Sequence, residues 1–139
     1  MQPRKILFVL FTLITLTLHA QRWVGTWACA PQTVDKSFMP YNNQMTNRSV
    51  RQVVKVSIGG DVIRLRLSNE MSSEPVEITS VYIAEAQESA EIRKETARYL
   101  QFGKRHGVTI AAGKAVFSDA LKFNLAPLSR IAITINYRK

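Results

Sequence analysis

Aliphatic and polar residues alternate in several short stretches of this chain. On both sides of Gly59 and Gly60, aliphatic residues occupy every second position, over residues 54–58 and again over 63–67. Such alternation places the aliphatic side chains on one face of a strand, and glycine tolerates the backbone angles of a tight turn. The pattern predicts a β-hairpin with its aliphatic face inward. The other face would carry Lys55, Arg64 and Arg66.

The same alternation recurs towards the C-terminus. It covers residues 76–83, 121–125 and 131–137. Between the first two, Val108 and Ile110 precede a turn at residues 111–113, and Val116 and Phe117 follow it. Within the first of these stretches the inward parity switches near Thr79 and Ser80, as a β-bulge requires. Six or more short strands separated by turn residues predict an all-β fold, an antiparallel, jelly-roll-like β-sandwich.

One segment, residues 84–100, does not alternate. It is rich in Ala, Glu, Lys and Arg, whose propensities favour a helix of about four turns. Its apolar residues form only a partial helical stripe, and Glu91 and Glu95 would place like charges one turn apart. Two structures stay open for residues 84–97: a short exposed helix, or a polar loop that leads into a strand near residues 98–102.

The first twenty residues have the order of a secretory signal peptide. Arg4 and Lys5 precede an apolar run over residues 6–18, and Ala20 supplies the small residue of a cleavage site. The apolar run is shorter than the roughly 20 residues of a membrane-spanning helix. We expect cleavage near Ala20, a secreted or periplasmic protein without a stable membrane anchor, and a β-sandwich domain over residues 21–139.

Composition and charge narrow the classes of partner. The chain has 139 residues, of which 46% are hydrophobic, so it fits one globular domain. Loss of Arg4 and Lys5 on export lowers the formal net charge from +9 to +7. The remaining basic residues are dispersed and lack interleaved aromatic residues, which favours a solvated surface and no nucleic-acid partner.

Cys29 is the one cysteine of the chain, so an intramolecular disulfide cannot form. We expect Cys29 to be a small packed residue.

Candidate chemistry is sparse. After export His106 is the one histidine, in a turn-like stretch, and no Gly-x-Ser-x-Gly segment occurs. The carboxylates of Asp35, Asp61 and Asp119 show no metal-ligand spacing. We therefore predict no catalytic residue, no metal site and no cofactor in this chain.

Four segments, in chain order, resemble secreted SGNH/GDSL-type hydrolases of the GDSL-like lipase/acylhydrolase family. They are WVGTWACAPQ at residues 23–32, SVRQVV at 49–54, GGDVIRLRLSN at 59–69, and the set FG, VTIAAG and SD at 102–103, 108–113 and 118–119. Two departures occur: Ser49 stands where the family usually has Thr, and Glu70-Met71 replaces the usual Phe-Gly. The resemblance covers about all of the mature chain.

This resemblance implies the N-terminal β-sandwich of an ester hydrolase whose α/β part carries the chemistry. In the family a Gly-Asp-Ser motif holds the nucleophile, a Gly and an Asn help to bind the oxyanion, and Asp-x-x-His completes the set. Here Val62 follows Gly60-Asp61, and Gly103 stands where Asp would precede His106. We expect a sequence truncated before the Gly-Asp-Ser motif, inactive alone, with a downstream or separate SGNH catalytic domain as its partner.

The function stays open between three hypotheses. The first is the non-catalytic domain of an esterase acting on acylated carbohydrate or lipid. The others are a stand-alone carbohydrate-binding module and a basic cell-envelope interaction module. Aromatic residues available to stack on sugars are Trp23, Trp27, Tyr41 and Tyr82. Candidates for substrate binding are Trp27, Arg51 and Asn69, although hydrogen bonding at strand ends is the expected role of the last two. Under the first hypothesis an apolar docking surface is expected near residues 23–31 and at the last strand.

Overall fold

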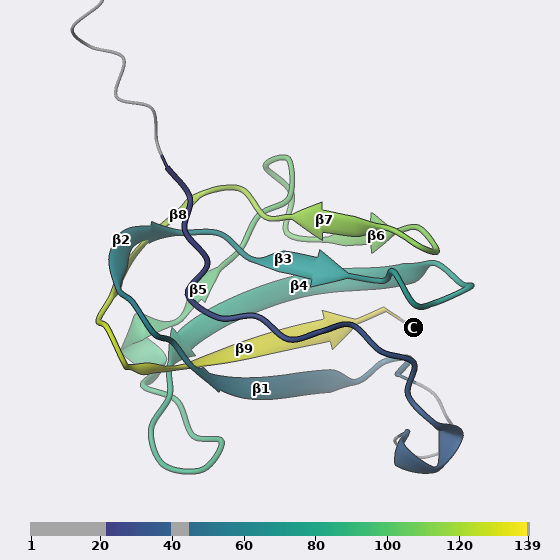
Figure 1. Ribbon diagram of the computed structural model, residues 1–139, viewed down its shortest axis with the longest axis horizontal. Coiled ribbons are helices and arrows are strands. Elements are labelled where there is room, and N and C mark those ends of the chain that lie inside the picture. The colour runs from purple at the N-terminus through teal and green to yellow at the C-terminus, as the bar shows by residue number, and fades with distance from the viewer. Residues whose placement is uncertain (1–21, 40–44, 139) are drawn as a thin grey trace, which may run out of the picture.

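A computed structural model describes residues 22–39 and 45–138 of the chain. The predicted signal peptide, residues 1–20, and Tyr41 lie outside these ranges. Within them the fold is all-β and antiparallel, as predicted (Figure 1). A search of the same ranges finds no helix with the length and apolar character needed to cross a membrane.

The strands form two layers. The main sheet has the order β1-β9-β4-β5, and β6 also pairs with β4. Its strands are β1 (Ser49–Lys55), β9 (Arg130–Tyr137), β4 (Val76–Glu85), β5 (Arg98–Tyr99) and β6 (Val108–Ile110). The second layer pairs β2 (Gly60–Ile63) with β8 (Leu121–Leu125), and β3 (Arg66–Ser68) with β7 (Ala115–Phe117). Two short 3-10 turns, η1 (Lys36–Phe38) and η3 (Lys94–Thr96), complete the elements of the described ranges.

The aliphatic faces of the two layers meet in one hydrophobic core. From the main sheet the core contains Val54, Val81, Ile83, Ile131 and Ile133, and from the second layer Phe123 and Leu125. Ile63, Leu65 and Leu67 pack against it, half-buried. The alternation in the sequence therefore predicted the inward face of these strands correctly.

The predicted hairpin around Gly59 and Gly60 is wrong. β1 pairs with β9 and β2 pairs with β8, so the two strands flanking the turn are not partners. The chain instead crosses from the main sheet to the second layer, and both aliphatic faces reach the core from opposite sides. Alternation fixes the face that a strand buries but not the neighbour it bonds to. At the crossing, Ile58 was expected to point inward but is 43% exposed.

Ser118 joins the two halves of the second layer. The β2-β8 and β3-β7 pairs form one bent ribbon that breaks at residues 64–65 and 118–120. At the break the Ser118 N–H donates to the Leu65 carbonyl (2.8 Å), and the Ser118 hydroxyl accepts from the Leu65 N–H (2.9 Å). Because Ser118 is buried, these bonds satisfy backbone groups that water does not reach.

Two further expectations concern β4 and the segment after it. The register of β4 against β9 shifts between Ile78 and Ser80, which confirms the predicted β-bulge. Residues 86–97 form a polar loop with one 3-10 turn and lead into β5, so the loop alternative is correct and the four-turn helix does not form. Ala84 and Glu85 belong to β4, where pairing with β9 overrides their helix propensity.

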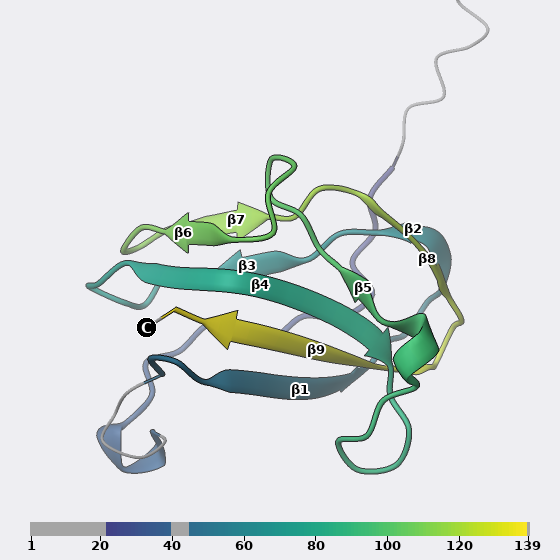
Figure 2. The ribbon, with the colours of Figure 1, turned by 180° about the vertical axis from the view of Figure 1, so that it is seen from behind.

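The N-terminal segment lies on the surface of the second layer. It crosses in front of the main sheet in Figure 1 and behind it in Figure 2, on the same side as β2 and β3. Thr26 fastens it there, because its hydroxyl donates to the Ile58 carbonyl (2.6 Å) and accepts from the Ile58 N–H (3.0 Å). Cys29 is exposed in this segment, so the prediction that it is a packed residue is wrong.

Candidate functional site

Four side chains line up across the outer face of the main sheet, the face turned away from the core. In the strand register Arg51 of β1 lies opposite Thr134 of β9, Thr134 opposite Tyr82 of β4, and Tyr82 opposite Tyr99 of β5. We call these four residues the outer row. Ile83, next to Tyr82, belongs to the core, so the alternation of β4 turns Tyr82 outward.

Arg51 is held in place by neutral acceptors. Its Nε donates to the Thr134 hydroxyl (2.8 Å), one terminal nitrogen to the Tyr82 hydroxyl (2.7 Å), and the other to the Ala90 carbonyl (2.8 Å). In residues 22–39 and 45–138 the ion pairs are Arg66–Glu70, Arg93–Glu85, Arg93–Glu95 and Arg138–Glu77, and none includes Arg51. The guanidinium is thus fixed while its charge stays uncompensated by a paired carboxylate.

Three residues of the outer row, Arg51, Tyr82 and Tyr99, line an open depression of about 920 Å³, which we call the outer depression. The 86–97 loop forms its rim, and Figure 2 shows this loop and η3 beside the ends of β4 and β9. The lining includes Arg51, Tyr82, Glu91, Lys94, Ala97 and Tyr99. It therefore combines aromatic rings with two cationic groups, one carboxylate and polar groups.

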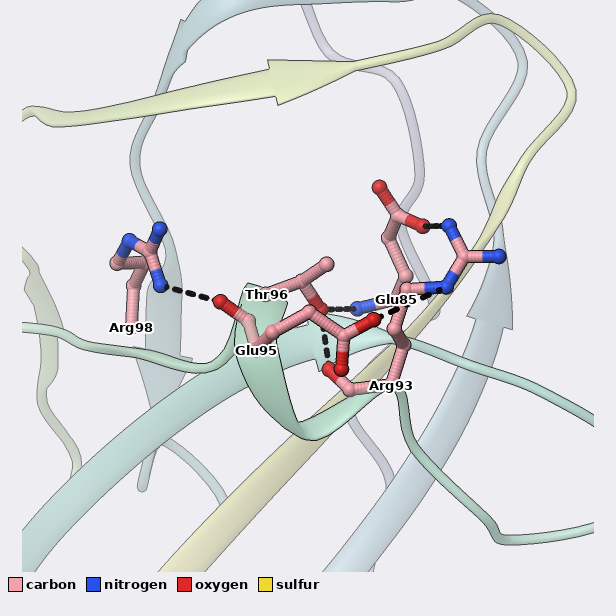
Figure 3. A network of polar contacts seen from close by, with 5 residues as sticks. All are labelled: Glu85, Arg93, Glu95, Thr96 and Arg98. Carbon is pink, nitrogen blue, oxygen red and sulfur yellow. Dashed lines mark hydrogen bonds and ion pairs between the residues drawn. The ribbon is translucent and has the colours of Figure 1, made fainter.

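The rim loop is tied to the end of β4 by a polar network (Figure 3). Arg93 pairs with the Glu85 carboxylate (2.7 Å), and the Thr96 hydroxyl accepts from the Glu85 N–H (2.9 Å). The same hydroxyl donates to the Arg93 carbonyl (2.6 Å), and Arg98 donates to the Glu95 carbonyl (2.9 Å). These bonds close the loop on itself, so the rim is preformed.

Electrostatics in the outer row act on Tyr82. The hydrogen bond from Thr134 lowers the pKa of the Tyr82 phenol below its ordinary value. The Arg51 guanidinium lowers this pKa further, whereas partial burial of the phenol raises it. Thr134 itself is only 3% exposed, since neighbouring side chains of the row cover it. A buried hydroxyl thus organises both the arginine and the tyrosine.

The three predicted substrate-binding candidates are not brought together. Arg51 lies in the outer depression. Trp27 is 44% exposed in the N-terminal segment, next to Thr26, which bonds Ile58 on the other side of the sandwich. Asn69 follows β3 and bonds a separate set of backbone groups. These candidates therefore do not form one site.

Asn69 joins two turns. Its side-chain amide donates to the carbonyls of Glu74 (2.8 Å), Ile110 (3.2 Å) and Ala111 (3.2 Å). Its backbone carbonyl accepts from the Gly113 N–H (3.1 Å). With its amide used in this way, Asn69 has the structural role expected of it at the strand end.

Residues of the family-like segments contact one another in pairs. Arg64 stacks over the ring of Trp23 at 4.4 Å, and Asn69 bonds Ala111 as above. The Asp119 carboxylate accepts from the N–H groups of Gly103 (3.1 Å) and Lys104 (2.7 Å). Both of these turn residues have positive φ angles, of 59° and 65°. These residues of the four segments thus stabilise turns of the sandwich and contacts between its segments.

The polar contact of the His106 ring, in the part of the chain that the structure describes, is with a backbone carbonyl. Its Nδ1 lies 3.4 Å from the Leu100 carbonyl, and its ring meets the ring of Tyr99 edge-on at 5.5 Å. The same described ranges contain no cluster of three or more His, Cys, Asp or Glu able to hold a metal ion. His106 extends the line of rings formed by Tyr82 and Tyr99, whose centroids are also 5.5 Å apart.

Sequence reasoning missed Tyr99, Thr134 and Lys94 as members of this site. Tyr99 lies in the segment 84–100, whose apolar residues form only a partial helical stripe and so give no sign of a strand position. A signal for Thr134 is present, since it is a polar residue inside the aliphatic run 131–135. Its partner Arg51 becomes visible only through the strand register.

No family model and no curated protein sequence matches this chain.

Proposed function

We propose that this chain is the non-catalytic β-sandwich domain of an exported SGNH/GDSL-type ester hydrolase, which removes acyl groups from carbohydrate or lipid esters. Its partner is an SGNH catalytic domain that supplies the nucleophile and base. The observation that carries the proposal is the pairing of the family-like segments, Trp23 with Arg64, Asn69 with Ala111 and Asp119 with Gly103. The shared residues therefore maintain a scaffold, which accounts for a resemblance without catalytic groups.

The environment of the potential catalytic groups supports a scaffold role. The Ser118 hydroxyl is buried and engaged with Leu65 and with the Asp119 carbonyl. His106 contacts Tyr99 and the Leu100 carbonyl. A hydrolytic serine needs a free hydroxyl bonded to a base. The geometry of Ser118 does not meet that requirement.

Exposed aromatic residues on the second layer supply a docking surface for the catalytic domain. Arg64 is sandwiched between the rings of Trp23 and Phe117, at 4.4 Å from each. Trp23 is 37% exposed and Phe117 51% exposed, and Val62 shares the outward parity of Arg64. Exposed aromatic clusters of this kind mark interaction surfaces. The surface lies near residues 23–31, where docking was expected.

The last strand was the second place where an exposed apolar surface was expected, but its residues 131–134 are buried. β9 lies between β1 and β4 in the main sheet, and Ile131, Ala132, Ile133 and Thr134 are buried. Its backbone is paired on both sides, so β9 has no free edge to offer. Docking is therefore assigned to the Trp23, Arg64 and Phe117 cluster alone.

The test is a binding titration between the exported chain and SGNH catalytic domains encoded in the same genome. We expect one of them to bind, and Trp23→Ser or Phe117→Ser to weaken binding about tenfold, the loss of roughly 1.4 kcal/mol at a hot spot. Phe38→Ser is the matched control, since Phe38 is 82% exposed in η1, away from the cluster. Failure of every such domain to bind would contradict the proposal.

A second assay addresses the chain alone. We expect no hydrolysis of a short-chain aryl ester above that of the His106→Ala variant. Turnover that His106→Ala abolishes would show that the chain carries its own base. An alternative function, carbohydrate binding by a self-sufficient module, is favoured by one observation, the aromatic and cationic lining of the outer depression.

A further inference from the structure

The outer depression presents a fixed positive charge. Each of the three nitrogens of Arg51 donates to a neutral acceptor, at 2.7 to 2.8 Å. Within the ranges that the structure describes, the ion pairs leave Arg51 out. A planar guanidinium that is already oriented is well suited to a carboxylate, because little side-chain entropy remains to be lost on binding.

Beside this charge, the depression offers aromatic surface. Tyr99 is 55% exposed, and its ring lies 5.5 Å from the Tyr82 ring at an interplanar angle of 59°. The two rings belong to residues that line the depression. Two neighbouring rings in an open depression fit an extended chain of apolar faces with polar edges, which is the chemistry of a polysaccharide, better than an enclosed small molecule.

Further groups match the polar edges of a sugar chain. Lys94 adds a second cation at the rim, so the two cations Arg51 and Lys94 outnumber the one carboxylate of the lining, that of Glu91. Gln87 and Ser89 add side chains with hydrogen-bonding groups. The Glu85–Arg93 pair and the Thr96 hydroxyl hold the rim loop closed. A preformed rim means that a ligand does not have to order the loop on binding.

We propose that the outer depression binds an acidic polysaccharide, with a uronate carboxylate on Arg51 and sugar rings against Tyr99 and Tyr82. The site lies on the outer face of the main sheet, whereas the Trp23, Arg64 and Phe117 cluster lies on the second layer. Binding of the polysaccharide therefore does not depend on a catalytic partner, and it is measured with this chain alone.

The experiment is affinity electrophoresis of the exported chain through gels that contain polygalacturonate, neutral galactan or poly-L-glutamate. Poly-L-glutamate has carboxylates without sugar rings, so it measures the attraction due to net positive charge. We expect polygalacturonate to retard the chain most, poly-L-glutamate weakly and galactan least. Equal retardation by polygalacturonate and poly-L-glutamate would overturn the proposal, as would equal retardation by galactan and polygalacturonate.

Variants separate the two halves of the site. Tyr99→Phe keeps the ring and should bind polygalacturonate as the parent does, whereas Tyr99→Ala should lose about tenfold in affinity. Arg51→Gln should lose a similar factor, and Arg51→Lys, which keeps the charge without the planar fork, should recover part of it. Met71→Ala, another exposed apolar residue outside the depression, is the control.

Folding is checked separately because Arg51 also holds the rim loop. Near-UV circular dichroism and urea unfolding of each variant should match the parent, and Tyr99→Ala, which removes an exposed ring, keeps the test valid if Arg51→Gln unfolds. Unchanged binding of Tyr99→Ala would overturn the proposal. A failure here would leave binding to an SGNH domain unaffected, so the two proposals fail independently.

Discussion

The carboxylate of Asp119 accepts the backbone N–H of Lys104 at 2.7 Å, across fifteen residues of sequence. It accepts the Gly103 N–H as well, and both turn residues have positive φ. A non-glycine residue such as Lys104 adopts this conformation at a cost, and the carboxylate offsets it. A surface aspartate in a family-like segment thus sets the shape of a distant turn.

We predict that Asp119→Ala lowers the free energy of unfolding by about 2 kcal/mol, because two charge-assisted hydrogen bonds are lost. Urea unfolding measures the change. Asp61→Ala is the control, since Asp61 is exposed in β2, and it should change stability by less than about 0.5 kcal/mol. Equal effects of the two substitutions would contradict the role given to Asp119.

Ser118→Ala should cost about 1–3 kcal/mol, because the Leu65 N–H is left without its acceptor in a buried place. Ser72→Ala is the matched control. The Ser72 hydroxyl also accepts a backbone N–H, that of Glu74 at 3.1 Å, but it is exposed and water replaces it. The difference between the two variants in urea unfolding isolates the effect of burial.

Gly59 and Gly60 are neighbours with opposite tolerance to a side chain. A Cβ at Gly59 would collide with the Leu125 carbonyl and lie 2.9 Å from the Pro127 ring, whereas one at Gly60 meets nothing within 4 Å. Gly59→Ala should therefore destabilise the fold by about 3 kcal/mol, and Gly60→Ala by less than about 1 kcal/mol. Thermal unfolding of both variants tests the layer crossing; a tolerated Gly59→Ala would argue against it.

Two tyrosines should titrate on opposite sides of the ordinary value of about 10. Hydrogen bonding from Thr134, helped by Arg51, lowers the pKa of Tyr82, and burial raises the pKa of Tyr137. In an alkaline titration followed by tyrosinate absorbance, Tyr82→Phe should remove a phenol that titrates below the ordinary value, and Tyr137→Phe one that titrates above it. Thr134→Val should move the pKa of Tyr82 back towards the ordinary value.

The sign of the effect on stability follows from proton binding. Between the lowered pKa of Tyr82 and the ordinary value, the unfolded chain binds more protons than the folded chain, so Tyr82 makes stability rise with pH. Tyr137 acts in the opposite direction above the ordinary value, because there the folded chain keeps its proton. Unfolding curves of Tyr82→Phe and Tyr137→Phe through this pH range should therefore diverge from the parent in opposite senses.

Local pattern was enough to predict which residues face the core, but not which strands pair. The bulge near Thr79 and Ser80 was visible because a change of parity is a local property of one strand. The partners of β1 and β2 were not visible, since pairing is decided between segments far apart in the chain. The outer row depends on the register of four strands, and so only Arg51 and Tyr82 could be picked out beforehand, each without its neighbours.

The central position of β9 has a consequence for how the chain folds. β9 pairs with β1 and β4, and Ser49 lies opposite Asn136. During synthesis both earlier strands wait with open edges until residues 130–137 have left the ribosome, and pairing between strands so far apart in the chain forms slowly. Until that insertion, the waiting edges are open to pairing with other chains, so a chaperone that covers them would favour correct assembly.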